Sequence, residues 1–257
     1  MTETPDQDYS EDTLLGGRVR LRQPRRGYRA AVDPVLLAAS VPTRAGERVL
    51  DVGVGTGAAT LCLAARVKGL AIVGLEVQPD LADLARGNVE LNGCAASVSI
   101  LDGDVMASPP GLTEGSFHQV MTNPPYGAEG TRSPESSRDL AHGAADLERW
   151  LTFCVRMLRH KGWLTVIHRA DHLDRVVSLL QGHLGGIELL PVWPREGEPA
   201  RRVIIRGRRG VATPATLFPG LVLHDDHGYT DRAHAVLWDG RAFDAKAESV
   251  QIPPERP

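Results

Sequence analysis

The sequence predicts an α/β fold, a seven-stranded and mostly parallel sheet with helices on both faces. Short apolar segments alternate with amphipathic segments of helical length from Arg48 to Val192, a pattern typical of βα units in a parallel sheet. The last two strand segments have no helix between them, which predicts an antiparallel edge strand. The length of 257 residues suits one such domain with a modest N-terminal extension.

The chain is expected to divide into four parts. Residues 1–12 are polar and acidic and predict a disordered tail, with 248–257 as its counterpart. Between them we expect an N-terminal extension over 13–45 and the main α/β domain over 46–247. An acidic start of this kind is neither a signal peptide nor a membrane anchor.

The N-terminal extension is expected to begin with a β-hairpin. Thr13–Leu15 and Arg18–Gln23 flank a Gly16-Gly17 pair, a common hairpin turn. Asp33 then precedes Pro34, which suits the first position of a helix because it lacks an N–H. We therefore expect Asp33 to be the N-cap of a short helix.

The strands and helices of the main domain follow from apolar periodicity. Strands are expected at Val49–Val52, Ala71–Glu76, Ser97–Leu101, Gln119–Thr122, Leu164–His168, Ile187–Val192 and Val203–Arg206, and helices at Ala58–Val67, Pro79–Asn92, Leu147–His160 and Asp171–Leu184. The polar segment Gly127–Asp146 is rich in Gly, Ser, Arg and Glu and predicts a long substrate loop or lid.

Cysteine usage and hydropathy narrow the class of protein. Cys62, Cys94 and Cys154 are scattered and form no CxxC pair, which favours a reducing, cytoplasmic location and small buried thiols over a disulfide or metal framework. His224 and His227 have the spacing of metal ligands, but a polar turn explains them better. No metal ion is therefore expected. No apolar run reaches membrane-spanning length.

A glycine-rich loop marks the expected cofactor site. Gly53, Gly55 and Gly57 follow the first strand of the main domain and open the next helix, where a nucleotide-type cofactor binds in an open α/β sheet. Glycines allow a sharp turn and close approach of a ligand. Glu76 ends the next strand, where a carboxylate can accept hydrogen bonds from ribose hydroxyls.

The identity of that cofactor depends on the acidic residues around the loop. Gly53, Gly55 and Ala58 also fit the dinucleotide pattern GxGxxA. Asp51, however, would repel a pyrophosphate and suits the cationic amino-acid end of S-adenosylmethionine. Asp104 follows the third strand and can accept a hydrogen bond from the adenine amino group. The alternative is that Asp51 and Asp104 are only turn caps. With Glu76, the three acidic strand ends resemble the class I methyltransferase site.

The segment Asn123-Pro124-Pro125-Tyr126 after the fourth strand is the most specific signal. Two prolines make the backbone rigid and extended. The Asn123 side-chain oxygen and the Pro124 carbonyl oxygen could accept hydrogen bonds from the two N–H groups of an exocyclic amino group. An adenine that carries this group could stack on Tyr126. Such catalysis is mainly positioning and electrostatics. The alternative is a proline-rich turn capped by Asn123.

This tetrad resembles that of the amino-methyltransferases, which act on adenine N6 or cytosine N4 in DNA, on RNA, or on a release-factor glutamine. From about residue 13 to 230 the chain is similar to the bacterial tRNA1(Val) adenine-N6 methyltransferase group. The matching stretches are Gly27-Tyr28-Arg29 to Leu37, the glycine loop, Asn123–Tyr126, Ser133-Pro134 to Arg138 with Ala141-His142, and Leu221–His224.

The resemblance implies a Rossmann-like methyltransferase domain over 46–247 and methylation of the adenine 3′ of the anticodon, with S-adenosylmethionine as cofactor. It implies cofactor contacts from the glycine loop and from acidic or amide side chains, and base contacts from the tetrad. The implied cofactor residues are Asp33, Asp51, Gly53, Gly55, Gly57, Glu76, Asp104 and Asn123, and the implied catalytic residues are Asn123, Pro124 and Tyr126.

Two arginine clusters, one from Arg18 to Arg29 and one from Arg195 to Arg209, favour an RNA substrate. The net charge of −3 does not by itself suggest nucleic-acid binding, but dense local clusters indicate phosphate contacts. Solvated surface faces are the alternative reading. The expected RNA-binding residues are Arg18, Arg20, Arg22, Arg25, Arg26, Arg29, Arg201 and Arg202.

Two other substrates remain open. The same tetrad could hold a glutamine amide of a protein, although those enzymes usually carry a helical recognition domain before the fold, and fewer than about fifty residues precede the glycine loop here. Methylation of duplex DNA usually requires a separate recognition domain.

Overall fold

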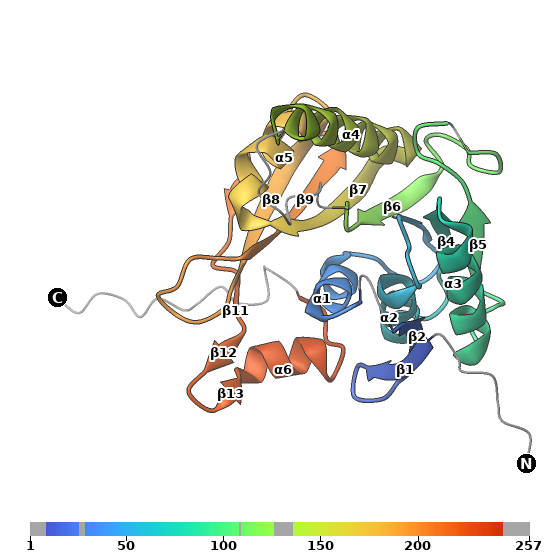
Figure 1. Cartoon of the computed structure of the whole chain (residues 1–257). Helices are drawn as coiled ribbons and strands as arrows, with labels where there is room; N and C mark the ends of the chain where they lie inside the picture. Colours follow the sequence, from blue (N-terminus) through green and yellow to red (C-terminus); the bar gives the residue numbers. More distant parts are fainter. Residues whose placement is uncertain (1–8, 26–28, 108, 126–135, 244–257) are drawn as a thin grey trace, which may run out of the picture.

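The structure is a computed structural model that describes residues 9–25, 29–107, 109–125 and 136–243 (Figure 1). The predicted tails lie largely outside these residues. The predicted hairpin starts earlier than expected, because β1 (Tyr9–Leu14) already begins inside the segment assigned to the disordered tail. It pairs antiparallel with β2 (Val19–Pro24).

The central sheet is confirmed, with seven long strands. They are β3 (Arg48–Val52), β4 (Ala71–Glu76), β5 (Val98–Asp102), β6 (Phe117–Thr122), β7 (Leu158–Arg169), β8 (Leu184–Trp193) and β9 (Arg202–Arg209). The order is β8-β9-β7-β6-β3-β4-β5. Two short strands, β10 (Thr216–Leu217) and β11 (Leu221–Val222), add parallel pairs to β8.

The antiparallel strand β9 lies inside the sheet and not at its edge. It pairs antiparallel with both β7 and β8. A direct connection without a helix forces β9 to run opposite to β8, and both of its backbone edges are then hydrogen-bonded. The buried run Val203–Ile205 was the sequence signal, because an apolar run without alternation is typical of a strand covered on both faces.

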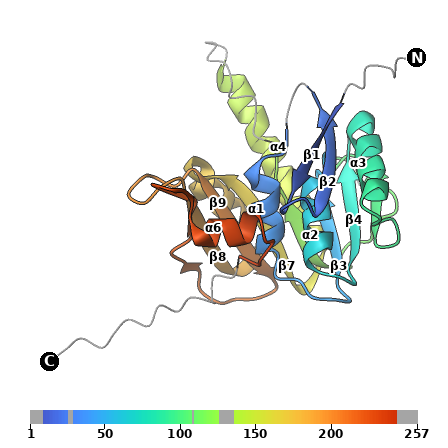
Figure 2. The same cartoon turned by 90° about the horizontal axis from the view of Figure 1, so that it is seen from below.

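Helices cover both faces of the sheet (Figures 1 and 2). On one face lie α1 (Val32–Ser40), α2 (Ala58–Arg66) and α3 (Pro79–Leu91), and on the other α4 (Ser136–Met157) and α5 (Leu173–Leu180), which follows the 3-10 turn Ala170–His172. The short helix α6 (Asp231–Leu237) packs against α1. It follows a small hairpin of β12 (His224–Asp225) and β13 (Gly228–Tyr229).

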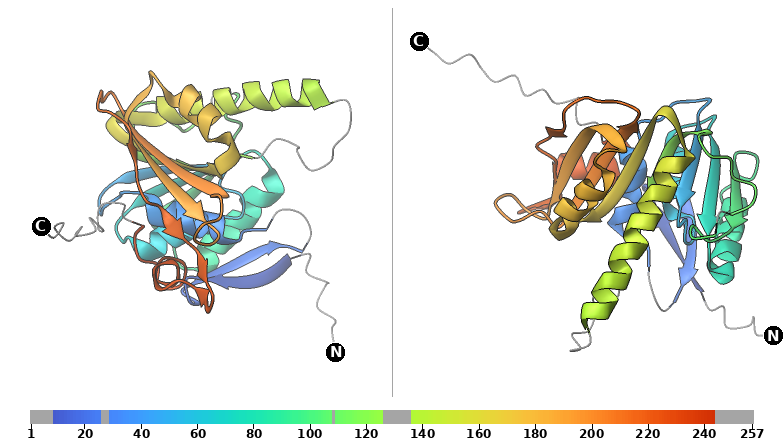
Figure 3. Two further views of the ribbon diagram at one scale, coloured as in Figure 1. Left: turned by 90° about the vertical axis from the view of Figure 1, so that its left-hand side faces the viewer. Right: turned by 90° about the horizontal axis from the view of Figure 1, so that it is seen from above.

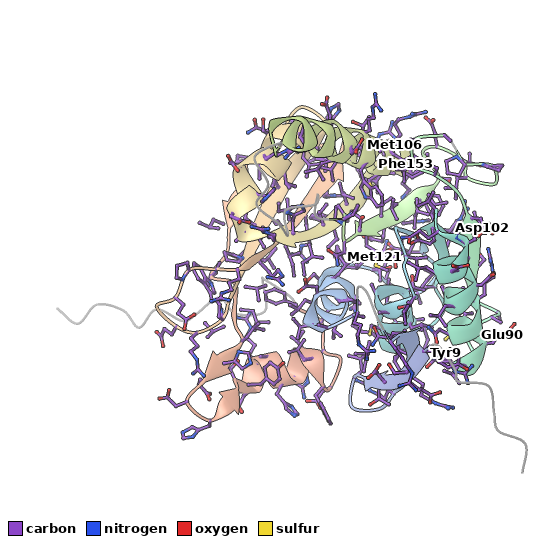
Figure 4. All side chains as sticks on the ribbon, viewed as in Figure 1. Tyr9, Glu90, Asp102, Met106, Met121 and Phe153 are labelled. Atoms are coloured by element: carbon purple, nitrogen blue, oxygen red, sulfur yellow. The ribbon has the colours of Figure 1, made fainter. Side chains whose placement is uncertain are left out.

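The two faces have separate apolar cores. Val49 of β3 and Met121 of β6 join the core beneath α1 and α2, and Met121 lies between the layers in Figure 4. Leu50 and Val52 join the core beneath α4 and α5. This alternation is expected of a strand buried on both faces.

Helix α4 is longer than expected. The segment 136–146 was predicted as part of a loop, but it forms the first half of α4, which projects beyond the sheet (Figure 3). Gly143 and two serines in this stretch suggested a loop, whereas Leu140, Ala141, Ala144 and Ala145 are strong helix formers. Residues 127–135 of that predicted loop lie outside the described part.

The hairpin is fixed to the main domain by α3. Asn88 and Asn92 exchange hydrogen bonds with the backbone of Arg22 and Arg20, at 2.7–2.9 Å. Leu21 of β2 is fully buried in the core with α1. The predicted extension is therefore packed onto the sheet layer rather than appended to it.

Among the described residues, no helix is long and apolar enough to span a bilayer. The three cysteines are free thiols. Cys62 and Cys154 are buried as expected, while Cys94 is half-buried.

Candidate functional site

Four parallel strands bring the predicted cofactor residues to one edge of the sheet. Asp51 lies near the end of β3, Glu76 ends β4, Asp104 follows β5 and Asn123 follows β6. The four strands are neighbours in the order β6-β3-β4-β5. These side chains therefore share the carboxyl edge, where open α/β sheets bind ligands.

The glycine loop has the backbone expected of a ligand cradle. Gly53, Gly55 and Gly57 have φ values of 75°, 57° and 90°, which favour glycine. A Cβ added at Gly55 would meet nothing within 4 Å. The Glu76 carboxylate accepts hydrogen bonds from the N–H groups of Gly55 (2.9 Å) and Gln78 (3.0 Å). Glu76 thus holds the loop at the end of its own strand.

Asp51 is a buried carboxyl group at this edge of the sheet. Its side chain is buried, with 2% exposure, and Thr60 Oγ1 of α2 donates a hydrogen bond to it at 2.7 Å. Burial raises the pKa of Asp51 to about 7, and the nearby charge of Glu76 acts in the same direction, while the Thr60 bond opposes both. Such a carboxyl would be stabilised as an anion by a cationic group placed beside it.

Asp104 lies in a turn at the same edge. Its side chain accepts a hydrogen bond from the N–H of Met106 at 2.8 Å. The next residues, Val105 and Met106, form one wall of a groove of about 460 Å³, and α4 forms the other with Phe153 and Arg149. Met106 and Phe153 lie side by side in Figure 4. The groove continues from the carboxyl edge along α4.

Trp150 of α4 joins the glycine loop to the start of the tetrad, a role that sequence reasoning missed. Its indole lies on Gly53, where an added Cβ would be 2.8 Å from the ring. Its Nε1 donates to Thr122 Oγ1 at 2.8 Å, and Thr122 Oγ1 donates to the carbonyl of Val52, also at 2.8 Å. The only sequence signal is the position of Trp150 beside Leu151 on an amphipathic helix.

The tetrad begins beside the glycine loop. The sheet register pairs Val52 with Thr122, so Asn123 starts level with Gly53. Asn123 is half-buried, Pro124 is buried and Pro125 is exposed. Tyr126 lies outside the described residues.

Asp33 is not the helix N-cap that its position suggested. Ala31 occupies the N-cap of α1, and no side chain caps the helix. Asp33 instead accepts two hydrogen bonds from Nε of Arg202, at 2.9 and 3.1 Å. Asp33, a predicted cofactor residue, and Arg202, a predicted RNA-binding residue, are therefore in direct contact.

Acidic side chains of β1 neutralise part of the first arginine cluster. Glu11 pairs with Arg20 at 2.7 Å and with Arg22 at 3.4 Å, and Asp12 pairs with Arg29 at 2.6 Å. Arg18 donates instead to the carbonyls of Leu15 and Trp238. Arg25 is exposed, and Arg26 lies outside the described residues.

The second arginine cluster is divided along β9. Arg201 is exposed and Arg202 half-buried at the carboxyl edge. Arg206 is buried in mid-strand, where it pairs with Glu188. Arg208 and Arg209 lie at the opposite, amino edge, because β9 runs antiparallel to β7. The arginines of this cluster therefore lie in three different environments, namely the carboxyl edge, the buried middle of β9 and the amino edge.

Among the described residues, no group of three or more His, Cys, Asp or Glu side chains could hold a metal ion. His224 and His227 lie in the β12–β13 hairpin, as the predicted polar turn requires. The His224 ring stacks on Tyr229 with centroids 4.6 Å apart.

Comparison with known sequences gives a consistent set of relatives. Residues 31–190 match the family model described as methyltransferase small domain. A tRNA1(Val) (adenine(37)-N6)-methyltransferase from Yersinia pseudotuberculosis (strain IP32953) is 27% identical over 89% of this chain and 93% of its own. The enzyme of the same name from Aeromonas salmonicida is 28% identical over 73% of this chain and 79% of its own.

Solved structures share the fold. A predicted O-methyltransferase from Agrobacterium tumefaciens is 27% identical, with a TM-score of 0.67 over 79% of this chain and 94% of that chain. A T. thermophilus 16S rRNA N2 G1207 methyltransferase, solved with AdoMet and guanosine, is 17% identical, with a TM-score of 0.54 over 78% of this chain and 50% of that chain. At that lower identity the likeness concerns the fold alone.

Proposed function

Because the chain belongs to the methyltransferase small domain family, we propose that it methylates N6 of an adenine in tRNA, at position 37 of tRNA1(Val). The family makes it a methyltransferase, and S-adenosylmethionine is its methyl donor. The adenine and its position are supported by relatives of that name that align with 69–89% of this chain.

One observation carries the proposal. The Asn123-Pro124 segment leaves the sheet level with the glycine loop, since Val52 pairs with Thr122. An amino group held by this segment would therefore lie beside a cofactor held by the loop. Trp150 fixes that spacing, because it contacts Gly53 and Thr122 together.

The residues of the site fit the proposed cofactor. The open space at Gly55 and the positive φ values of the loop suit close approach by a ligand. Asp51 would attract the cationic amino-acid end, Glu76 would accept from ribose hydroxyls, and Asp104 from the adenine amino group. Asp33, which accepts hydrogen bonds from Arg202, would lie near the amino-acid end. When bound, the cofactor supplies an electrophilic methyl group on a good leaving group.

The protein's own part in the reaction would be orientation. The Asn123 side-chain oxygen and the Pro124 carbonyl oxygen accept hydrogen bonds from the two N–H groups of the target amino group. These two hydrogen bonds hold its nitrogen in place. Pro124 and Pro125 fix the backbone that carries these acceptors. Tyr126 is assigned to base stacking on the sequence alone. No general base is required before methyl transfer, because the proton leaves afterwards; the rate comes from positioning.

RNA contacts are assigned to the arginines of the carboxyl edge and the hairpin. Arg201 and Arg25 are exposed and would reach phosphates flanking the target base, while Arg18, Arg20, Arg22, Arg26, Arg29 and Arg202 complete the proposed set. A tRNA substrate also implies that the protein works in the cytoplasm.

The test is a substrate panel. We expect the protein, given labelled cofactor and total undermethylated tRNA, rRNA, DNA and release factor, to label tRNA, with the methyl group on N6 of adenine 37 by mass spectrometry. Asn123→Ala serves as the inactive control. Label on the release-factor glutamine or on DNA, with none on tRNA, would refute the assignment.

A further inference from the structure

The amino edge of the sheet, opposite the proposed catalytic site, carries a concentration of cations that the reaction does not use. They come from the loop before β3, from β3, from the end of α4 and from the outer ends of β7 and β9. We call this set the amino-edge surface; it consists of Arg44, Arg48, Arg156, Arg159, Lys161, Arg208 and Arg209.

Contacts link these residues in smaller sets. Arg209 Nη1 donates to the carbonyl of Arg156 at 3.1 Å, and Arg208 Nε donates to the carbonyl of Lys161 at 3.3 Å. The pKa of His118 is lowered by burial first and then by the charge of Arg159. The cations therefore lie close enough to act together.

Within the described part of the chain, two carboxylates pair with cations of this surface. Glu47 pairs with Arg44 at 3.4 Å, and Glu114 pairs with Arg156. Arg159 and Lys161 are exposed beside them. The chain as a whole has a net charge of −3, so such an excess of positive charge at one edge of the sheet is a local feature that favours a polyanion.

The surface contains a groove of about 540 Å³. Most of its lining is apolar, and four guanidinium or imidazole side chains belong to it, those of Arg156, His160, His183 and Arg209. Gly210 makes room in it, because a Cβ there would be 2.5 Å from Nδ1 of His160. Guanidinium and imidazole groups around a groove are suited to hydrogen-bond the oxygens of a phosphate.

We propose that the amino-edge surface is a second RNA-binding site, which contacts phosphates of the substrate away from the methylated base. The inference rests on the proposed function. From Lys161 to Arg169, eight residue steps of roughly 3.3 Å give β7 a span of about 26 Å, so an RNA must extend at least this far from the methylated base to reach the groove. An RNA large enough to span this distance can contact both edges. The amino-edge surface is therefore assigned to phosphates in the body of the tRNA.

The test measures RNA affinity without cofactor, so its result does not depend on methylation. Arg159→Glu is compared with Arg241→Glu, an exposed arginine that follows α6, because both substitutions change the charge equally. Each is titrated with full-length undermethylated tRNA and with the isolated anticodon stem-loop over a range of salt concentrations.

We expect Arg159→Glu to weaken full-length tRNA binding roughly tenfold and to lower the slope of log K against log salt by about 1. Stem-loop affinity and stem-loop methylation should match the wild type, as should every value for Arg241→Glu. Lys161→Asn is the second variant, because its φ of 62° suits asparagine; it should repeat the loss in smaller measure.

Wild-type tRNA affinity and salt slope in Arg159→Glu and Lys161→Asn would overturn the proposal, as would an equal loss in Arg241→Glu. Failure of the proposed function would show differently, as wild-type protein that leaves tRNA unmethylated in the substrate panel while its RNA affinity still depends on Arg159.

Discussion

At the scale of single residues, the acidic side chains of the candidate site are held in different ways: Asp51 is buried beside Thr60, and Asp33 pairs with Arg202. The places of Asp51 and Glu76 at the carboxyl edge follow from where their strands end, whereas the hydrogen bond from the Gly55 N–H to Glu76 was not predicted. The pairing of Asp33 with Arg202 could not be predicted, because these residues are 169 positions apart in sequence. Which side chains come into contact depends on the fold, and the order of residues in the sequence does not by itself predict such distant pairs.

Asn123 provides the sharpest test of the reaction. Asn123→Ala should lower the single-turnover rate about 100- to 1000-fold, because a side chain that stabilises developing charge is lost. The cofactor dissociation constant, measured by calorimetry, should stay near the wild-type value. A single-turnover rate equal to the wild type would remove Asn123 from the mechanism.

Asp51 should make cofactor binding depend on pH. Its pKa is raised to about 7, and only the ionised carboxylate attracts a cationic ligand. The affinity should therefore fall about tenfold as the pH falls from about 8 to about 6, in step with the ionised fraction. Asp51→Asn should bind weakly at both pH values, and an equal pH dependence in this variant would contradict the assignment.

The same pKa has a consequence for stability. A carboxyl whose folded pKa exceeds its unfolded value contributes stability below the unfolded pKa and loses that contribution as the pH rises through the folded value. Asp51 should therefore destabilise the ligand-free protein as the pH rises from about 4 to about 7. Denaturant unfolding of Asp51→Asn should lack this decrease.

At the scale of elements, boundaries with clear punctuation were predicted well. The strand Ala71–Glu76 was predicted to the residue, since Gly and Pro delimit it in the sequence. The first half of α4 was missed because its Gly and Ser content suggested a loop, although the backbone is helical from Ser136. Its packing partner is also non-local: Trp150 contacts a glycine nearly one hundred residues earlier.

The contact between α4 and the glycine loop can be tested with two glycines. Gly53→Ala puts a Cβ 2.8 Å from the Trp150 ring, whereas Gly55→Ala meets nothing within 4 Å, and both positions have positive φ. Gly53→Ala should cost about 1–3 kcal/mol more than Gly55→Ala in denaturant unfolding. Trp150→Leu in the Gly53→Ala background should recover part of the difference, and equal costs would exclude the clash.

The hairpin arginines should differ in their effect on RNA. Arg25→Glu with Arg26→Glu should weaken tRNA binding in a salt-dependent manner and leave cofactor affinity unchanged. Arg20→Glu, which changes the charge half as much and removes a guanidinium paired with Glu11, should have a smaller effect. Filter binding at two salt concentrations measures both, and a larger effect of Arg20→Glu would assign the contact to β2 rather than to Arg25 and Arg26.

At the scale of the whole molecule, the alternation of strands and helices was sufficient to predict the layers and the gathering of the predicted site residues at the carboxyl edge of the sheet. This alternation did not predict the order of the strands beyond β7. The position of a strand that pairs with both neighbours is indicated in the sequence only by an apolar run without alternation. Two basic sequence clusters were read as one kind of surface, yet the antiparallel course of β9 places Arg202 and Arg209 at opposite edges.

The insertion of β9 between β7 and β8 also governs how the chain can be made. A ribosome that has released the chain only as far as Trp193 has delivered β7 and β8 without the strand that separates them. The unpaired backbone of β7 is then an exposed template for pairing with other chains. Truncations that stop before Arg202 should therefore aggregate on expression, and full-length synthesis should benefit from a chaperone that shields this edge until the final strand arrives.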